Sequence, residues 1–163
     1  MMKKLAIVGG AIVLIVLLLI FWIVGGYNRV VKLSQGVDQQ WAQVQDVYQR
    51  RADLIPNLVQ TVSGAANFEK STLTEITNAR ASVGQVKIDP NSAPTDPAKL
   101  KEFEQSQGAL SSALSRLLVV SERYPELKSN QNFLTLQAQL EGTENRISVE
   151  RGRFNDATQA YNT

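Results

Sequence analysis

Two clusters of charged residues carry the side chains whose types and spacing could do chemistry. Both clusters combine arginine with carboxylates, and such charges form either a buried ion-pair network or a site for a ligand or a partner protein. The members are Arg50, Arg51 and Asp53 in the first cluster, and Glu141, Glu144 and Arg146 in the second. In an antiparallel helical bundle the two clusters would meet.

Arg51 is the member whose position constrains the fold most. It lies seven residues after Val44 and seven before Leu58, so it shares their apolar helix face. A charge on such a face costs several kcal/mol unless it has a partner. We expect Glu144 to be that partner and the network to fix the register of the helices. The alternative is a ligand or partner site built on the same charges.

Catalytic residues of the usual kinds are missing from the sequence. It contains no cysteine and no histidine, which excludes thiol nucleophiles, disulfides, imidazole bases and ordinary zinc sites. Its serines therefore have no histidine to activate them, and no glycine-rich phosphate loop occurs. We therefore predict no catalytic, cofactor-binding or metal-binding residue, and a protein that is not an enzyme.

The net charge of +2 does not indicate nucleic acid as a partner. Two of the 17 basic residues, Lys3 and Lys4, stand before an apolar segment. The remaining basic residues balance the 15 acidic ones. No basic patch with interleaved aromatic residues occurs, so we expect no nucleic-acid binding.

The apolar segment from Leu5 to Val24 has no charged residue. A helix of this length spans about 30 Å, the hydrocarbon thickness of a bilayer. Trp22 and Tyr27 lie at its distal end, where membrane proteins carry aromatic residues. The alternative, a cleaved signal peptide, has a shorter apolar run and a small-residue cleavage site. We predict a basic flank at 1–4 and a transmembrane anchor at 5–27, with the lipid bilayer as a partner.

The charges beside the anchor bear on its orientation. Lys3, Lys4 and the amino terminus lie on one side, and Arg29 and Lys32 lie on the other. The positive-inside rule favours a cytoplasmic N-terminus and an extracytoplasmic body, by a margin of about one charge.

The rest of the chain, 28–163, has helical periodicity and no alternating strand pattern. The first long stripe predicts one long amphipathic helix, either continuous with the anchor or joined to it at Gly25 and Gly26, with Pro56 as a kink rather than an end. The apolar stripes of the two other long helices contain Leu100, Phe103, Gln107, Leu110, Leu114 and Leu117 in one, and Phe133, Leu140, Ile147 and Phe154 in the other. With a shorter helix around Ile76, they predict an all-α, antiparallel up-down bundle of three long helices and one short helix behind the transmembrane helix.

The linker at 84–97 contains three of the five prolines, and we expect it to form an exposed, flexible loop. Asp96 and Pro97 are a typical helix start. Pro125 is expected to stop the helix before it, and Ser129 or Asn130 to cap the last one.

Several strings go beyond periodicity. They are Gln49-Arg50-Arg51-Ala52-Asp53-Leu54-Ile55-Pro56-Asn57-Leu58, Arg116-Leu117-Leu118-Val119-Val120, Leu140-Glu141-Gly142-Thr143-Glu144-Asn145-Arg146-Ile147 and Tyr161-Asn162-Thr163. With the N-terminal anchor they resemble the LemA family of bacterial membrane proteins, over essentially the whole chain. The resemblance implies an antiparallel bundle on a single-pass anchor in the bacterial cytoplasmic (inner) membrane. It assigns no catalytic activity.

The predicted helices have long apolar stripes, and the sequence has no recognisable set of catalytic residues. Both features favour a structural role. We expect a membrane-anchored scaffold that self-assembles into a homo-oligomer or organises partners, and the resemblance adds membrane shaping as a specific version. The alternative is an adaptor or regulator of another membrane protein, such as an envelope stress sensor or a protease.

Overall fold

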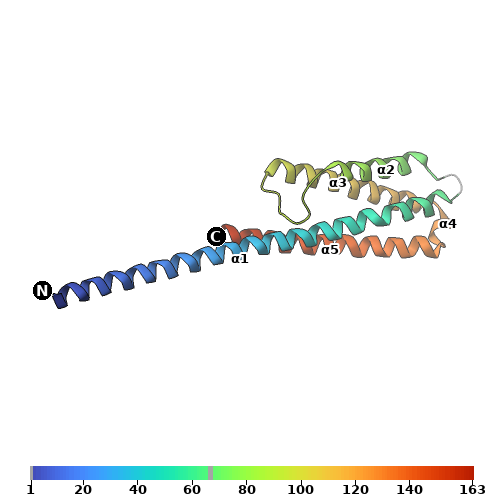
Figure 1. Ribbon diagram of the computed structural model, residues 1–163. Coiled ribbons are helices and arrows are strands. Elements are labelled where there is room, and N and C mark those ends of the chain that lie inside the picture. Colours follow the sequence, from blue (N-terminus) through green and yellow to red (C-terminus); the bar gives the residue numbers. More distant parts are fainter. Residues whose placement is uncertain (1, 66–67) are drawn as a thin grey trace.

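The computed structural model describes residues 2–65 and 68–163 and contains helices without any strand among these residues. The helices are α1 (Met2–Ser63), α2 (Lys70–Gln85), α3 (Pro97–Ser121), α4 (Pro125–Lys128) and α5 (Gln131–Asn162). The prediction of an all-α bundle with an N-terminal apolar helix is confirmed. Figure 1 shows an elongated molecule in which the N-terminal part of α1 projects beyond the bundle.

Helix α1 is one continuous element of 62 residues. At 1.5 Å per residue its length is about 93 Å. The helix is continuous through Gly25 and Gly26, the one place where the sequence left room for a joint. Nothing packs near either glycine to force a bend there. The anchor and the body therefore share one rigid element.

Pro56 interrupts the hydrogen bonding of α1 without ending the helix, as predicted. Proline has no N–H, so it cannot bond the carbonyl of Ala52 one turn earlier. Arg80 of α2 takes this place, because its Nε donates to the Ala52 oxygen at 3.1 Å. The proline thus creates an acceptor that ties α2 to α1.

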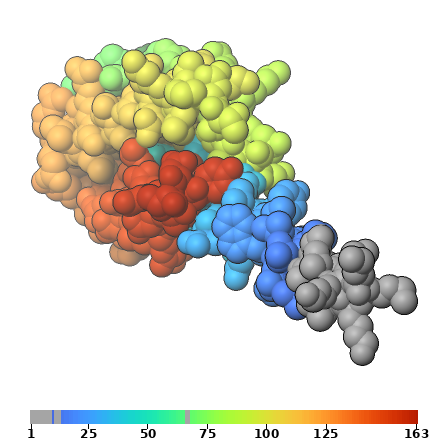
Figure 2. Space-filling model, turned by 90° about the vertical axis from the view of Figure 1, so that its left-hand side faces the viewer, coloured from blue at the N-terminus to red at the C-terminus, as the bar shows by residue number. Residues whose placement is uncertain are grey.

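The bundle is built from two helix pairs (Figure 1). Helix α5 runs antiparallel along α1, and α2 packs against α3 above them. The single-turn helix α4 connects α3 to α5. Helix α3 ends at Ser121, and Pro125 begins α4 rather than simply stopping the preceding helix. The space-filling view shows the blue part of α1 extending away from this bundle (Figure 2).

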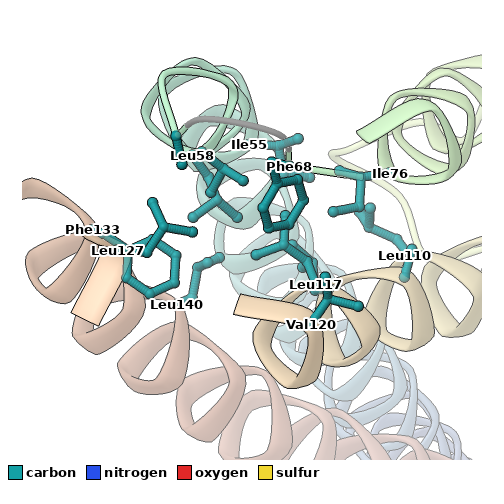
Figure 3. Close-up of a cluster of buried hydrophobic side chains, with 14 residues drawn as sticks. Ile55, Leu58, Phe68, Ile76, Leu110, Leu117, Val120, Leu127, Phe133 and Leu140 are labelled. Carbon is teal, nitrogen blue, oxygen red and sulfur yellow. The ribbon is translucent and has the colours of Figure 1, made fainter. Parts of the chain in front are cut away.

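Two hydrophobic clusters hold the pairs together. In the larger one, side chains from all five helices converge, with Leu58, Ile76, Leu117, Leu127 and Phe133 among them (Figure 3). Burying such side chains is the main favourable term in folding.

The second cluster lies nearer the apolar end of α1 and is rich in aromatic residues. The ring of Trp41 lies 5.5 Å from that of Phe103 and 5.3 Å from that of Phe154. The ring of Tyr48 meets Phe103 edge-on at 5.2 Å. These contacts join α1, α3 and α5 at one level.

The loop between α2 and α3 comprises residues 86–96, so both ends of the linker predicted at 84–97 belong to the helices, and contacts attach this loop to α1. Most of its residues are exposed, but Ile88 and Ala93 pack against the aromatic cluster. The indole nitrogen of Trp41 donates to the Asp89 carbonyl at 3.0 Å. The Ala93 amide donates to Asp38 Oδ1 at 2.9 Å.

Side-chain caps fix where two of the helices begin. The carboxylate of Asp96 accepts from the Ala98 amide at 2.9 Å, with Pro97 at the first position of α3. Of the two candidates for the last cap, it is Asn130 that accepts from the amides of Asn132 and Phe133. Such caps satisfy amides that have no partner inside the helix.

Candidate functional site

The centre of the bundle contains a buried guanidinium. Arg51 projects from α1 into the space between α3 and α5, and only 1% of it is exposed. It lies one turn before Ile55 and two before Leu58, on the face that forms the core. A charge in this position stays folded only if acceptors surround it.

Four acceptors from two helices meet Arg51. Nη1 donates to Glu144 Oε1 of α5 at 2.7 Å and to Ser111 Oγ of α3 at 2.5 Å. Nη2 donates to the Gln107 carbonyl at 3.1 Å and also to the side-chain oxygen of Gln107. One side chain therefore links three helices and fixes their relative height.

The partner of Arg51 is less buried than Arg51 itself. The side chain of Glu144 is 41% exposed, so water reaches this residue. The Nε of Arg51 is buried and has no hydrogen-bond partner in the part of the chain that the structure describes. The charge balance of the site thus depends on a single carboxylate at its rim.

The structure does not bring together the other four residues of the two clusters. Arg50 and Arg146 are exposed and form no ion pair within residues 2–65 and 68–163. Asp53 accepts from Gln49 at 2.8 Å, and Glu141 accepts from Gln137 at 3.1 Å, both along their own helices. The network therefore contains only Arg51 and Glu144 of the six candidates.

Gln107 and Ser111 complete the network, and the sequence analysis assigned them no role in it. A glutamine within the apolar stripe of α3 was the available signal, because buried amides need hydrogen-bond partners. Ser111 gave no comparable signal, since it lies among several serines on the same helix.

An aromatic ring covers one side of the guanidinium. The carbon Cζ of Arg51 lies 5.1 Å from the centre of the Tyr48 ring, within the range of a cation–π contact. Burial raises the pKa of the Tyr48 hydroxyl above its usual value of 10.0, against the opposing effects of Arg151 and Arg51. Tyr48 is therefore neutral at physiological pH.

This arrangement is suited to holding three helices together. Its one guanidinium and its one carboxylate are already engaged with each other. Over the same part of the chain, no group of acidic side chains could hold a metal ion. A groove of about 390 Å³ between α3 and α5 lies beside Glu144, with Leu114 and Leu140 in its lining.

A second, larger groove lies between α1 and α5 at the end far from the apolar segment. Its volume is about 570 Å³. Among the described residues no charged side chain lines it, and its polar residues are amides and hydroxyls: Asn57, Gln60, Thr61, Asn130, Asn132, Thr135 and Gln139.

The third candidate region is the apolar part of α1, predicted to run from Leu5 to Val24. The side chain of Leu5 lies outside the described residues. From Leu14 to Val24 every side chain is exposed, with Phe21 at 81% and Trp22 at 79%. The helix from Leu14 to Ser63 contains an 18-residue window that is apolar enough to cross a membrane, and none of this window is buried inside the protein.

Comparison with known proteins identifies the family. The model of the LemA family matches residues 40–163, which is more than half of the chain. The chain belongs to the LemA family. The matched range includes both charged clusters and all four helices after α1, whereas the apolar segment lies outside it.

Three curated relatives are similar over most of this chain. Protein LemA of Metamycoplasma hominis is 24% identical over 88% of the chain. Magnetosome protein MamQ 2 of Paramagnetospirillum magneticum is 27% identical, and magnetosome protein MamQ of Magnetospirillum gryphiswaldense is 26% identical, each over 83% of the chain. The chain spans 61% of the length of the first relative and 56% of each of the others.

Membership of the LemA family agrees with the exposed apolar helix. Both the LemA family match and the N-terminal apolar helix agree with a membrane-associated protein. The prediction of a membrane anchor is supported at this level.

Proposed function

We propose that this LemA protein is a non-enzymatic, membrane-anchored scaffold that assembles laterally with copies of itself. The observation that carries the proposal is the continuity of α1, which runs without a break from the apolar segment into the core of the bundle. A flexible tether would let the body reorient freely. An unbroken helix instead holds the helical bundle of each copy at the same height and tilt relative to its membrane anchor.

The helical bundle after the apolar segment supports this role, because its buried polar and aromatic contacts hold the helices rigidly together. The buried charge of Arg51 bonds α3 and α5, and the aromatic cluster joins the same helices at a second level. Since two of the curated relatives described above are named magnetosome proteins, shaping of a bacterial membrane compartment is the specific form of the role that we propose.

We place the anchor in the bacterial cytoplasmic membrane, with the N-terminus in the cytoplasm and the body outside it. The proposal rests on the lysines at positions 3 and 4, which outweigh the charges beyond the apolar segment when the amino terminus is included. Cysteine introduced at exposed Ser82 of α2 would then react with a membrane-impermeant maleimide in intact spheroplasts. If the cysteine reacts only after the spheroplasts are lysed, the bundle lies in the cytoplasm and the proposed orientation is wrong.

The mass of the particle tests the scaffold directly. The full chain is extracted into mild detergent and measured by light scattering coupled to gel filtration, after washing the membranes with alkaline carbonate. A scaffold stays in the carbonate-washed membranes and gives a homogeneous particle of several copies. Release by carbonate would contradict the anchor, and a monomer would contradict assembly.

A second candidate function is an adaptor for another membrane protein, such as an envelope stress sensor or a protease. The uncharged groove between α1 and α5 favours it, because exposed amides can pair with the backbone of a partner segment. A monomeric particle that retains a defined membrane protein during purification from native membranes would support the adaptor over the scaffold.

A further inference from the structure

Helix α5 has an outward face that the rest of the described chain leaves open. Ala138, Gly142, Asn145, Val149 and Gly152, which we call the outer stripe, are all exposed. They lie on the side of α5 opposite its buried residues Leu140, Thr143 and Ile147. In Figure 2 the red C-terminal part of α5 is uncovered on the face turned to the viewer.

The spacing of the outer stripe is that of a coiled-coil seam. Its residues alternate steps of four and three, which are the d and a positions of a heptad. Val149 is 52% exposed and is one of the few large apolar side chains exposed outside the apolar segment. Nothing in the described chain occupies the space beside Gly142 or Gly152, so no internal contact requires glycine there.

Two exposed residues of opposite charge, Glu141 and Arg146, flank the stripe on opposite sides. Glu141 precedes the a-position Gly142, and Arg146 follows the d-position Asn145, so they occupy the g and e positions. Arg146 forms no ion pair among the described residues, and the hydrogen bond of Glu141 is to Gln137 of its own helix. In a parallel pair of helices, a g residue meets the e residue five positions later on the partner.

The membrane anchor supplies the orientation that this charge pattern needs. Copies in one bilayer share the same topology, so their α5 helices run parallel and begin at the same height. Glu141 of one copy then faces Arg146 of another, and the symmetric contact is repeated on the other side of the twofold axis. An antiparallel partner, or one at another height, would not align these charges.

We propose that the outer stripe of α5 binds the same stripe of a second copy in a parallel, in-register pair. Asn145 faces its counterpart across the axis, and two side-chain amides that face each other can form a hydrogen bond. The glycines allow close approach, and the pairs between Glu141 and Arg146 set the register. This inference rests on the proposed assembly and names the face by which it occurs.

Cysteine cross-linking in membranes tests the contact, because the native chain contains no cysteine. A d residue lies within disulfide distance of its counterpart in a parallel pair. We expect Asn145→Cys to form a covalent dimer in native membranes under mild oxidation. Asn78→Cys, the same change at an exposed position of α2, is the matched control and should stay monomeric under the same conditions. Equal cross-linking of both variants, or none at Asn145→Cys, would overturn the proposal.

Charge exchange tests the register independently of the disulfide. In the Asn145→Cys background, Glu141→Arg or Arg146→Glu places like charges across the contact and should reduce the dimer yield at least about threefold. The double exchange should restore the yield, since the pairs form again with reversed sign. Circular dichroism must show unchanged helicity in all variants. A double variant as weak as either single one would overturn the g-to-e pairing.

Particle mass separates this inference from the proposed function. If the wild-type chain is oligomeric and Asn145→Cys does not cross-link, the proposed face is wrong while the scaffold stands. If the chain is monomeric, both fail.

Discussion

At the scale of single residues, Arg51 shows why the bundle has one register. Its guanidinium reaches α3 and α5 at once, and a shift of either helix by one turn would remove its acceptors. The burial of the two charges is unequal, since Arg51 is 1% exposed and the Glu144 side chain 41%. Removing the carboxylate therefore strands a buried charge, whereas removing the arginine leaves a carboxylate that water can reach.

This inequality predicts the effect of breaking the pair. Glu144→Ala should lower the free energy of unfolding by roughly 3–5 kcal/mol, because Arg51 stays buried with only neutral acceptors. Adding Arg51→Met should restore most of the loss, since the stranded charge is then gone. Denaturant titration of the full chain in detergent measures both. The control Glu102→Ala, at an exposed carboxylate of α3, should change stability by no more than about 0.5 kcal/mol. Small, additive effects would contradict the buried pair.

Tyr48 predicts how stability depends on alkaline pH. Burial raises the pKa of its hydroxyl above 10.0 in the folded protein. Above pH 10.0 the unfolded chain releases this proton while the folded protein keeps it, so stability falls as pH rises towards the raised pKa. Tyr48→Phe should make this fall shallower, as measured by urea unfolding between about pH 9 and 11. Tyr161→Phe, at an exposed ring, should leave the slope unchanged. Identical slopes for wild type and Tyr48→Phe would refute the raised pKa.

At the scale of elements, Pro56 couples α1 to α2 through the carbonyl that it releases. Arg80→Ala should cost about 0.5–1.5 kcal/mol, since the Ala52 oxygen loses its donor. Pro56→Ala supplies an N–H one turn away. It should raise stability by an amount bounded by the roughly 3 kcal/mol that an interior proline costs a helix.

The coupling between the two positions follows from this competition for one carbonyl. In the Pro56→Ala background, Arg80→Ala should have almost no effect, because the backbone N–H already satisfies the Ala52 oxygen. A double-mutant cycle by chemical unfolding measures the coupling. An Arg80→Ala cost that persists at full size in that background would argue against it.

The loop between α2 and α3 should be protected by its bonds to α1. Asp38→Ala removes the acceptor of the Ala93 amide, so limited proteolysis should cleave residues 86–96 several times faster than in the wild type. Asp46→Ala changes an exposed carboxylate of the same helix and should leave the rate unchanged. Equal rates in all three proteins would mean that the bond from Asp38 does not hold the loop.

Sequence periodicity predicted the elements and the central pair, because both follow from which residues share a helix face. The seven-residue spacing placed Arg51 on the core side of α1, and the antiparallel arrangement placed Glu144 opposite it. The other four charged candidates came from their nearness in sequence, and adjacent residues of a helix point in different directions. The loop bonds and the Arg80 contact depend on tertiary packing between distant segments, which no local pattern encodes.

At the scale of the whole molecule, the continuous helix α1 connects the bundle rigidly to the apolar segment that anchors it. The same helix carries the exposed apolar segment, the buried Arg51 and apolar residues of both clusters. Orientation set in the membrane is therefore passed directly to the outer stripe of α5. In the scaffold that we propose, this coupling is what aligns neighbouring copies.

An insertion between Gly26 and Tyr27 tests this central claim most directly. An insertion of four alanines extends the helix by slightly more than one turn and keeps it rigid. An insertion of the same length, Gly-Ser-Gly-Ser, makes the connection flexible. The measurement is the mass of the full-length particle by light scattering in detergent, with membrane retention and helicity verified first. We predict that the alanine variant keeps the wild-type oligomer and that the glycine–serine variant dissociates to smaller particles. Equal masses for both variants would contradict the claim that the rigid connection through α1 organises the assembly.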